Sequence, residues 1–470
     1  MNPASKLRSL AESQPDSLAL VSSSVKMTYR DLSENVARFS GALRKAGISK
    51  GSVVAVELAP ELEAVVILAL AHLGAASLTG SQVILSTYGN AIDFLVTQEH
   101  SRLSNNLSRV VIDAQFMQGL GAISKHLEPE PITQNQLVRL VFSSGTTGTP
   151  KGVPLTAGLL PVRTASAMQN WRRNPNGFSL LGLDTITGTI ALFWAIEYGQ
   201  TFYVASNPAA NLKLIVDHAI EVLETSPARL RDLVEAAEDQ EIKLKQVLVG
   251  GSLMAESLTT KCRRVFEVEP EYVYGSSELG SAAIGAFEPE EPNCVGLVVP
   301  DAIVEIVDDF GQKVDSETVG HIRYRKNRQP DDYWLIESDP RSGFHDGWFY
   351  PGDLGALSPG GTLRLAGRSD DMVNVSGNKF NLLTLDTWLT KTGLFDEVAS
   401  FTFTTEGETR VGLAFVSTNP PKPEVTIDRV RRLLPTLQIS EYLRLDELPR
   451  NLVDKIDRRA LSALIEGQHA

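Results

Sequence analysis

Residues 141–152 read VFSSGTTGTPKG and continue from the apolar run LVRLVF at 137–142. Two glycines and five hydroxyl side chains precede or flank a lysine: Gly145, Gly148, Ser143, Ser144, Thr146, Thr147, Thr149 and Lys151. Glycines let a loop turn its amides inward and hydroxyls add donors, so the loop suits a polyanion such as a triphosphate. Lys151 would add a compact positive charge. The spacing differs from the common P-loop because Gly152 follows the lysine, and such runs are also typical of surface loops.

Composition favours a cytoplasmic protein of two or three domains. The chain has 470 residues, of which 43% are hydrophobic and 21% charged, so it can build large cores. A net charge of −13 without a large basic cluster argues against nucleic-acid binding. Cys262 and Cys294 provide neither a disulfide framework nor a metal spacing. The N-terminus lacks the apolar core of a signal peptide, and no apolar stretch is long enough to span a membrane.

The pattern along the chain predicts an α/β fold. A helix, the buried strand VVAVEL (53–58) and an apolar helix over 62–73 follow one another. Residues 208–249 predict a helix–helix–strand unit, and YVYGSSELGS (272–281) predicts a strand, a glycine and a polar turn. Gly250 and Gly251 follow a strand, where open α/β sheets bind ligands, although an ordinary turn explains them equally well.

Four later motifs accompany the first: YGSSE (274–278), GWFYPGDLG (347–355), GRSDDMVNVSGNK (367–379) and LPRNLVDKIDRRAL (448–461). With the 143–151 loop, they resemble the adenylate-forming superfamily of acyl-CoA synthetases, peptide-synthetase adenylation domains and firefly luciferase. The resemblance covers essentially the whole chain, from Thr28 to Leu461. It implies a large multi-layer N-terminal α/β domain (1–367) and a smaller, mobile C-terminal α/β domain (368–470).

The resemblance also implies how ATP is held. The loop residues Ser143 to Gly148, with Lys151, would bind the outer phosphates, and Gly250 and Gly251 would lie nearby. Tyr274, Gly275, Ser276 and Ser277 match the family motif beside the α-phosphate, with Ser277 in place of its threonine. Glu278 would hold Mg²⁺, which prefers oxygen ligands and is usually bound by few carboxylates. A glutamate in a loop is otherwise a surface residue.

Asp353 corresponds to the aspartate that takes the ribose hydroxyls, although a Pro-Gly-Asp turn between strands is the alternative. Arg368 would reach the ribose or a phosphate, and Asp370 would be the pivot of a hinge near 369–371. Lys379 stands where the family carries a basic residue toward the nucleotide, and Gly377 belongs to the segment near the pantetheine passage. A solvated turn is the alternative for this charged run.

Lys455 matches the adenylation lysine of the family. The residue before it is normally glycine and is Asp454 here, and an adjacent carboxylate partly screens the ammonium. The region of the acyl pocket, 156–247, is shorter than in most relatives. In GLDTITG (182–188), Asp184 would repel a carboxylate or meet an amine, and a helix N-cap at Asp184 or Thr185 is the alternative.

These features predict an AMP-forming ligase that joins a small carboxylic acid to a thiol, with ATP and Mg²⁺ as cofactors and CoA as the first choice of thiol. One alternative loads the phosphopantetheine of a carrier protein. Another alternative is a degenerate nucleotide-binding homologue, which Asp454 and the shortened region of the acyl pocket would favour.

Overall fold

In the computed structural model, the chain forms two compact units. The first comprises Met1–Gly250, Leu258–Ala282 and Lys326–Ser338, and the second comprises Gly251–Ser257, Ala283–Arg325 and Asp339–Ala470. The described residues are 2–98, 103, 107–143, 149–171, 176–237, 240–252, 254, 256–288, 291, 293–336, 338, 343–369, 372–375, 378–405, 408–418, 420–433, 437–450 and 456–466.

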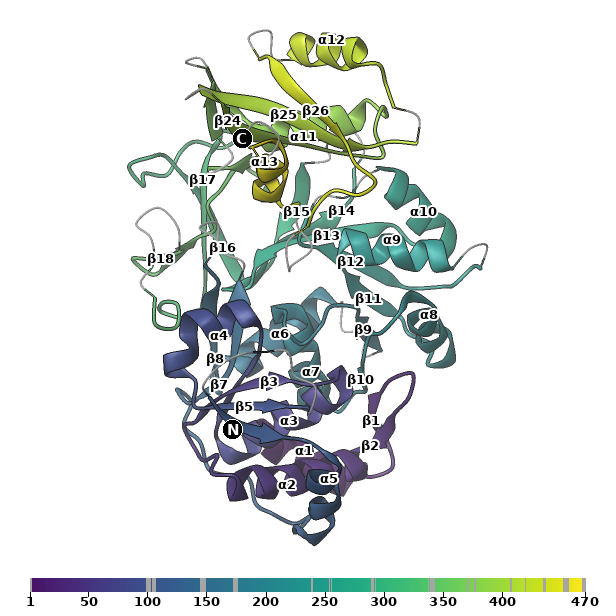
Figure 1. Ribbon diagram of the computed structural model, residues 1–470, viewed down its shortest axis with the longest axis vertical. Helices are drawn as coiled ribbons and strands as arrows, with labels where there is room; N and C mark the ends of the chain where they lie inside the picture. Colours follow the sequence, from purple (N-terminus) through teal and green to yellow (C-terminus); the bar gives the residue numbers. More distant parts are fainter. Residues whose placement is uncertain are drawn as a thin grey trace. The chain divides into compact units, whose positions relative to one another are not determined.

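A six-stranded sheet organises the N-terminal part of the first unit. Its order is β6-β5-β3-β4-β7-β8, parallel except for the β7–β8 hairpin. The strands are β3 (Val53–Glu57), β4 (Ala76–Thr79), β5 (Phe94–Thr97), β6 (Ser108–Val111), β7 (Leu137–Ser143) and β8 (Lys151–Thr156). The associated helices are α1 (Pro3–Ser13), α2 (Tyr29–Lys45), α3 (Pro60–Leu73), α4 (Gln82–Tyr88) and α5 (Ala114–Gly119). Helix α3 packs on β3 and β4 and is buried along most of its length, as its apolar sequence predicts (Figure 1).

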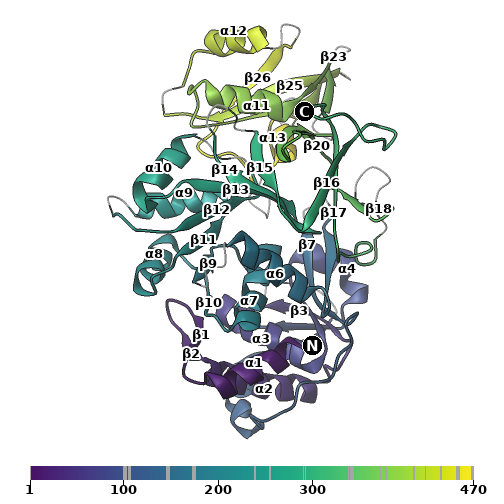
Figure 2. The same cartoon turned by 180° about the vertical axis from the view of Figure 1, so that it is seen from behind.

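Parallel strands in the order β13-β12-β11-β9 form a second sheet region of this unit. These strands are β9 (Gly177–Ser179), β11 (Val222–Thr225), β12 (Gln246–Gly250) and β13 (Pro270–Ser276). Helices α6 (Leu160–Asn170) and α7 (Ile186–Tyr198) pack together, as do α8 (Pro208–Asp217) and α9 (Pro227–Ala236) (Figure 2). Helix α10 (Glu256–Phe266) connects β12 to β13. A small sheet pairs β1 (Leu18–Val21) with β2 (Lys26–Thr28) and β10 (Phe202–Tyr203).

The second unit contains an antiparallel sheet followed by a small α/β segment. The sheet strands are β15 (Cys294–Val298), β16 (Ala302–Val307), β17 (Gly320–Lys326), β18 (Gly343–His345), β19 (Trp348–Tyr350), β20 (Asp353–Leu357) and β21 (Thr362–Arg368); β14 (Gly280–Ala286) begins in the first unit. The later elements are β22 (Met372–Val375), β23 (Asn378–Asn381), α11 (Leu382–Lys391), β24 (Glu397–Thr405), β25 (Glu408–Val416), α12 (Pro423–Leu433), β26 (Ile439–Arg444) and α13 (Arg458–Glu466). Strands β24, β25 and β26 form their own sheet, with apolar cores around Leu385 and Phe401.

The α/β class predicted from the sequence is confirmed, whereas the prediction for 208–249 is wrong in one element. The helices α8 and α9 are separated by the strand β11, which a helix–helix–strand pattern leaves out. This strand has only four residues, VLET, and one of them is charged, so its apolar run is too short to be separated from the flanking helices. The boundary at 367 and the hinge stay predictions.

Among the described residues, no helix has the length and apolar character needed to cross a membrane.

Candidate functional site

The hairpin of β7 and β8 holds the two ends of the predicted phosphate loop. Ser143 is the last residue of β7 and pairs with Lys151, the first residue of β8. The Ser143 hydroxyl donates to the Lys151 carbonyl at 3.5 Å. Five predicted loop residues lie outside the described residues: Ser144, Gly145, Thr146, Thr147 and Gly148. The described strands therefore fix where the loop starts and where its lysine stands.

Lys151 and Glu278 meet through Tyr333, a residue that the sequence motifs do not include. The Lys151 Nζ lies 4.9 Å from the centre of the Tyr333 ring, a cation–π contact. The Tyr333 hydroxyl donates to Glu278 Oε1 at 2.9 Å. The next residue, Trp334, donates its backbone N–H to the Gly152 carbonyl at 2.7 Å, which pins this segment to β8. Two predicted site residues thus converge on one phenol ring.

Glu278 is only 5% exposed, and Arg163 supports the turn that carries it. The buried Arg163 guanidinium, on α6, donates to the backbone carbonyls of Glu278 and Ser277. A single carboxylate with a phenol beside it fits Mg²⁺ that brings phosphate oxygens of its own, since this ion keeps few protein ligands. Within the described ranges, no three His, Cys, Asp or Glu side chains converge on a metal-sized site, so an all-protein cage does not fit.

The other residues predicted near the phosphates lie at the carboxyl ends of parallel strands. Gly250 ends β12, Gly251 follows it with a φ of +95°, and Tyr274, Gly275 and Ser276 end β13. Gly275 has a packing reason as well, because a Cβ atom there would lie 2.3 Å from the Gly280 carbonyl oxygen. The Ser276 hydroxyl accepts from the Leu279 amide at 3.2 Å, which orders the turn through Ser277. Ligands of open α/β sheets bind at this edge.

Asp353 and Arg368, both predicted at the ribose, face each other across β20 and β21. Arg368 Nη1 donates to Asp353 Oδ1 at 3.0 Å, and Arg368 Nη2 donates to the Pro351 carbonyl at 3.1 Å. The Ser369 hydroxyl and amide both donate to the Gly352 carbonyl. Asp353 therefore follows a turn in which Gly352 has a φ of +79°, as the turn interpretation predicts, and its role at the ribose stays a prediction.

Three predicted residues of the C-terminal part, Asp370, Gly377 and Lys455, lie outside the described residues. Lys379 lies in β23, and its side chain is not among those described.

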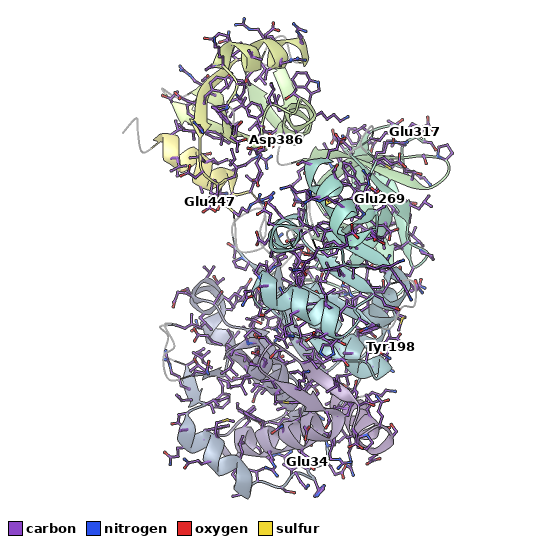
Figure 3. All side chains as sticks on the ribbon, turned by 90° about the vertical axis from the view of Figure 1, so that its right-hand side faces the viewer. Glu34, Tyr198, Glu269, Glu317, Asp386 and Glu447 are labelled. Atoms are coloured by element: carbon purple, nitrogen blue, oxygen red, sulfur yellow. The ribbon has the colours of Figure 1, made fainter. Side chains whose placement is uncertain are left out.

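An antiparallel bridge pairs Arg450 with Ile456, the described residues on either side of 451–455. Arg450 pairs with Glu397 at 2.8 Å, and Arg458 pairs with the buried Asp386 at 2.5 Å (Asp386 is labelled in Figure 3). Burial raises the pKa of Asp386, and the adjacent Arg458 opposes this shift. Arg450 is thus held on β24 and Arg458 on α11.

Thr185, not Asp184, is the N-cap of α7. The Thr185 hydroxyl accepts from the Gly188 amide at 3.0 Å and donates to the Gly182 carbonyl at 2.8 Å. Asp184 is exposed. The preceding carbonyl, of Leu183, accepts from the fully buried Arg139 at 2.6 Å. The capping alternative is therefore resolved in favour of Thr185, and the role of Asp184 toward a ligand stays a prediction.

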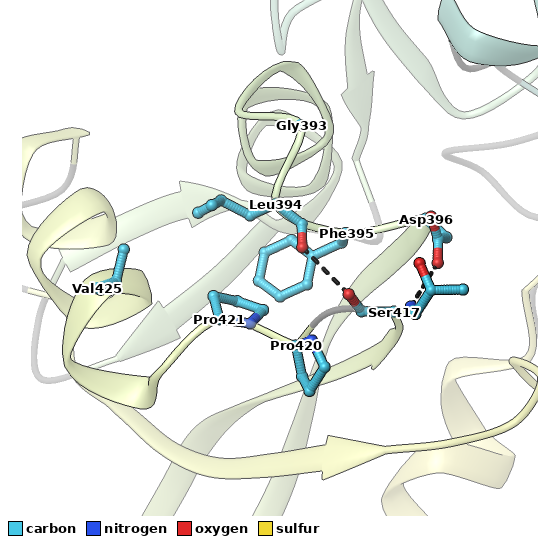
Figure 4. Close-up of a pocket in the computed structure, with 9 residues that line it drawn as sticks. Gly393, Leu394, Phe395, Asp396, Ser417, Pro420, Pro421 and Val425 are labelled. Atoms are coloured by element: carbon cyan, nitrogen blue, oxygen red, sulfur yellow. Dashed lines mark hydrogen bonds between the residues drawn. The ribbon is translucent and has the colours of Figure 1, made fainter.

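A pocket of about 380 Å³ lies in the C-terminal part (Figure 4), and none of the residues predicted for the site is among those that line it. Its wall includes a hydrogen bond from the Thr418 amide to Asp396 Oδ2 at 2.8 Å. The lining residues are Gly393, Leu394, Phe395, Asp396, Ser417, Thr418, Pro420, Pro421 and Val425.

Tyr333 and Arg163 are the functional candidates that the sequence did not reveal. Tyr333 lies 55 residues from Glu278 in a polar segment, and Arg163 lies within an ordinary helix pattern. Neither has a local motif, and only the fold brings them to Glu278.

Comparisons with known proteins agree with the motifs. Residues 7–334 match the family described as AMP-binding enzyme. The chain is 25% identical to tyrocidine synthase 3 of Brevibacillus parabrevis over 489 residues, which cover 96% of this chain and 7% of that protein. It is 24% identical to the 3-hydroxybenzoate–CoA ligase of Aromatoleum sp. (strain CIB) over 511 residues, which cover 97% of this chain and 95% of that enzyme.

Its fold is similar to that of o-succinylbenzoate CoA synthetase (MenE) from Bacillus subtilis, whose structure contains the acyl-adenylate intermediate OSB-AMP. The TM-score is 0.85 at 22% sequence identity, with 97% of each chain covered. The family match covers well over half of the sequence, and the structural likeness extends the same fold across both units. The chain belongs to the family of AMP-binding enzymes.

Proposed function

We propose that the protein activates a carboxylic acid with ATP and transfers the acyl group to a thiol, with CoA as the first choice. In the first step, a carboxylate oxygen of the acid attacks the α-phosphorus of ATP, and the bond to pyrophosphate breaks. In the second step, the thiol sulfur attacks the acyl carbon, loses its proton and releases AMP. The observation that carries this proposal is the convergence of Lys151 and Glu278 on Tyr333 in a chain of the AMP-binding family.

The residues of the first unit would act by positioning and by charge neutralisation. Lys151 and the 143–148 loop would take the charge of the departing pyrophosphate. The Tyr333 hydroxyl would hold the Glu278 carboxylate in one orientation, and Arg163 would fix the turn behind it. Magnesium, when bound at Glu278, would neutralise phosphate charge. Tyr274, Ser276 and Ser277 would hydrogen-bond the α-phosphate side.

The second unit would supply the ribose contacts and the adenylation lysine. Asp353 would accept hydrogen bonds from the ribose hydroxyls, while Arg368 holds its carboxylate in place. Lys455 would approach the developing charge on the carboxylate and α-phosphate, and Lys379 would face the nucleotide. A rotation about Asp370 would then exchange the lysine for the segment around Gly377, beside which the pantetheine would enter.

Acid-dependent exchange of labelled pyrophosphate into ATP tests the first step. The enzyme should catalyse exchange with at least one acid of a broad panel, and Lys455→Ala should abolish it. Adding CoA or a phosphopantetheinylated carrier to the active acid then identifies the thiol. The tyrocidine synthase match keeps a carrier protein as the second acceptor to be tested. Nucleotide binding without exchange for any acid would instead indicate a homologue that has lost the reaction.

A further inference from the structure

One face of the β9–β11–β12–β13 region carries polar side chains where a helix-covered parallel sheet normally carries apolar ones. We call it the polar wall and define it as Asn170, Trp171, Glu224, Gln246 and Glu271. In the parallel register, Val222 pairs with Gln246 and Leu248 pairs with both Glu224 and Glu271, so these side chains share a face. Val222 and Leu248 lie between these polar side chains and are completely buried, as are Leu223 and Val249 on the other face.

Hydrogen bonds join the polar wall to the end of α6. Trp171 Nε1–H donates to Glu224 Oε2 at 3.2 Å. Gln246 Nε2 donates to the Asn170 carbonyl at 3.0 Å and to Glu271 Oε2 at 2.6 Å. The Asn170 amide donates to the Ser281 hydroxyl at 2.9 Å. This pattern fixes the orientation of the Gln246 amide, because both acceptors lie on its nitrogen side.

One buried acceptor on this face has no donor among the described residues. Gln246 is 2% exposed, and no donor among the described residues reaches its Oε1 atom. Glu224 retains some accessible surface, yet burial raises its pKa to about 7 despite the hydrogen bond from Trp171. A buried acceptor without a partner is costly, so a group that completes this face has to donate hydrogen bonds.

The polar wall lies on the same strands as the proposed site. Glu224 and Glu271 are level with Leu248, two residues before Gly250, which corresponds to about 7 Å along a strand. Strand β13 continues from Glu271 to the Tyr274–Glu278 motif within the same unit. An acid whose carboxylate reacts beside that motif and whose other end reaches Glu224 would have about the length of a benzoate or a five-carbon chain.

We infer that the polar wall binds the end of the acid opposite its reacting carboxylate. The substrate is then a carboxylic acid whose other end carries a hydrogen-bond donor, an ammonium or a hydroxyl, and this donor is bound by Glu224 and Gln246. This inference rests on the proposed function. An ammonium would pair with the Glu224 carboxylate, whereas a hydroxyl needs only an acceptor. A second carboxylate at this position would be repelled by Glu224 and Glu271.

The experiment compares matched acids in pyrophosphate exchange: 5-aminopentanoate, 5-hydroxypentanoate, hexanoate and glutarate, and 4-hydroxybenzoate against 4-methylbenzoate. We expect kcat/KM for a donor-tailed acid to exceed that of its methyl counterpart by roughly 10- to 100-fold, the range of one hydrogen bond to a charged group.

Glu224→Met should abolish that preference. Glu224→Gln, which keeps the shape and one acceptor oxygen, should lose the ammonium preference and keep the hydroxyl preference. Glu221→Gln, which removes a carboxylate three residues earlier that pairs with Lys245, is the matched control.

Calorimetric binding of the same acids without ATP separates this inference from the proposed function. The inference is overturned, and the function kept, if pyrophosphate exchange occurs with a kcat/KM for the methyl acids or glutarate that equals or exceeds that for the donor-tailed acids. The same conclusion follows if both Glu224 variants keep the wild-type preference for donor-tailed acids. Glu224-dependent binding of donor-tailed acids without any exchange supports the inference and refutes the function. Absence of both binding and exchange overturns both. Glu224→Gln decides the result if Glu224→Met does not fold.

Discussion

Replacing Glu224 with glutamine should stabilise the protein more strongly as the pH rises. Burial raises the pKa of the folded-state carboxyl group from 4.5 to about 7. The folded chain therefore binds more protons than the unfolded chain between these values, and stability falls as pH rises through this window. Glutamine does not titrate. The free-energy difference between variant and wild type should thus grow by about 2.5 kcal/mol between roughly pH 5 and pH 8.

The measurement is urea unfolding of both proteins followed by tryptophan fluorescence, since Trp171 contacts Glu224. Comparing two variants at each pH cancels the titration of every other group. Glu221→Gln controls for the loss of a negative charge, since Glu221 directly precedes the strand of Glu224. Infrared difference spectra add a readout that needs no reversible unfolding, because the protonated acid band near neutral pH should disappear in Glu224→Gln. A stability difference that is independent of pH would refute the burial of this carboxyl group.

Further changes probe the nucleotide site and the hinge. Lys455→Ala should abolish acyl-adenylate formation and leave thioester formation from supplied acyl-adenylate largely intact; equal loss in both would rule out a role limited to adenylation. Asp353→Ala should weaken ATP binding by about 1.5–3 kcal/mol in calorimetry, because charge-assisted bonds to the ribose are lost and Arg368 loses its partner; unchanged affinity would leave Asp353 a turn residue. Asp370→Pro should preserve exchange and lower thioester synthesis by orders of magnitude, because proline fixes φ near −65°; wild-type rates in both steps would contradict the hinge. Tyr333→Phe should lower the exchange rate about tenfold at similar thermal stability, because Glu278 loses one charged hydrogen bond and Lys151 keeps its aromatic ring; an unchanged rate would show that Tyr333 only fills space.

Local motifs selected most of the candidate residues, because these residues lie in strand ends and turns whose sequences are short and ordered; their roles toward a ligand stay predictions. Lys151 at the start of β8 and Tyr274 at the end of β13 stand where the pattern places them. Tyr333 and Arg163 have no such signal, since long-range folding alone brings them to Glu278. The strand β11 was missed because four residues between two helices carry too little periodicity, and Glu224 was missed with it.

Pairing is the other feature that sequence could not supply. Asp353 and Arg368 were each assigned to the nucleotide, but their ion pair depends on the β20–β21 register. The choice between Asp184 and Thr185 as a helix cap likewise needed the geometry of the loop, because either side chain is a suitable cap.

The reaction proposed for this chain passes through an acyl-adenylate. Its most direct measurement uses an acid labelled with ¹⁸O in the carboxylate, incubated with ATP, Mg²⁺, CoA and the enzyme, followed by mass spectrometry of the nucleotide. Attack of a carboxylate oxygen on the α-phosphorus predicts that AMP carries one ¹⁸O atom and that unlabelled pyrophosphate is released. Production of ADP and phosphate, or of AMP without the label, would contradict the account.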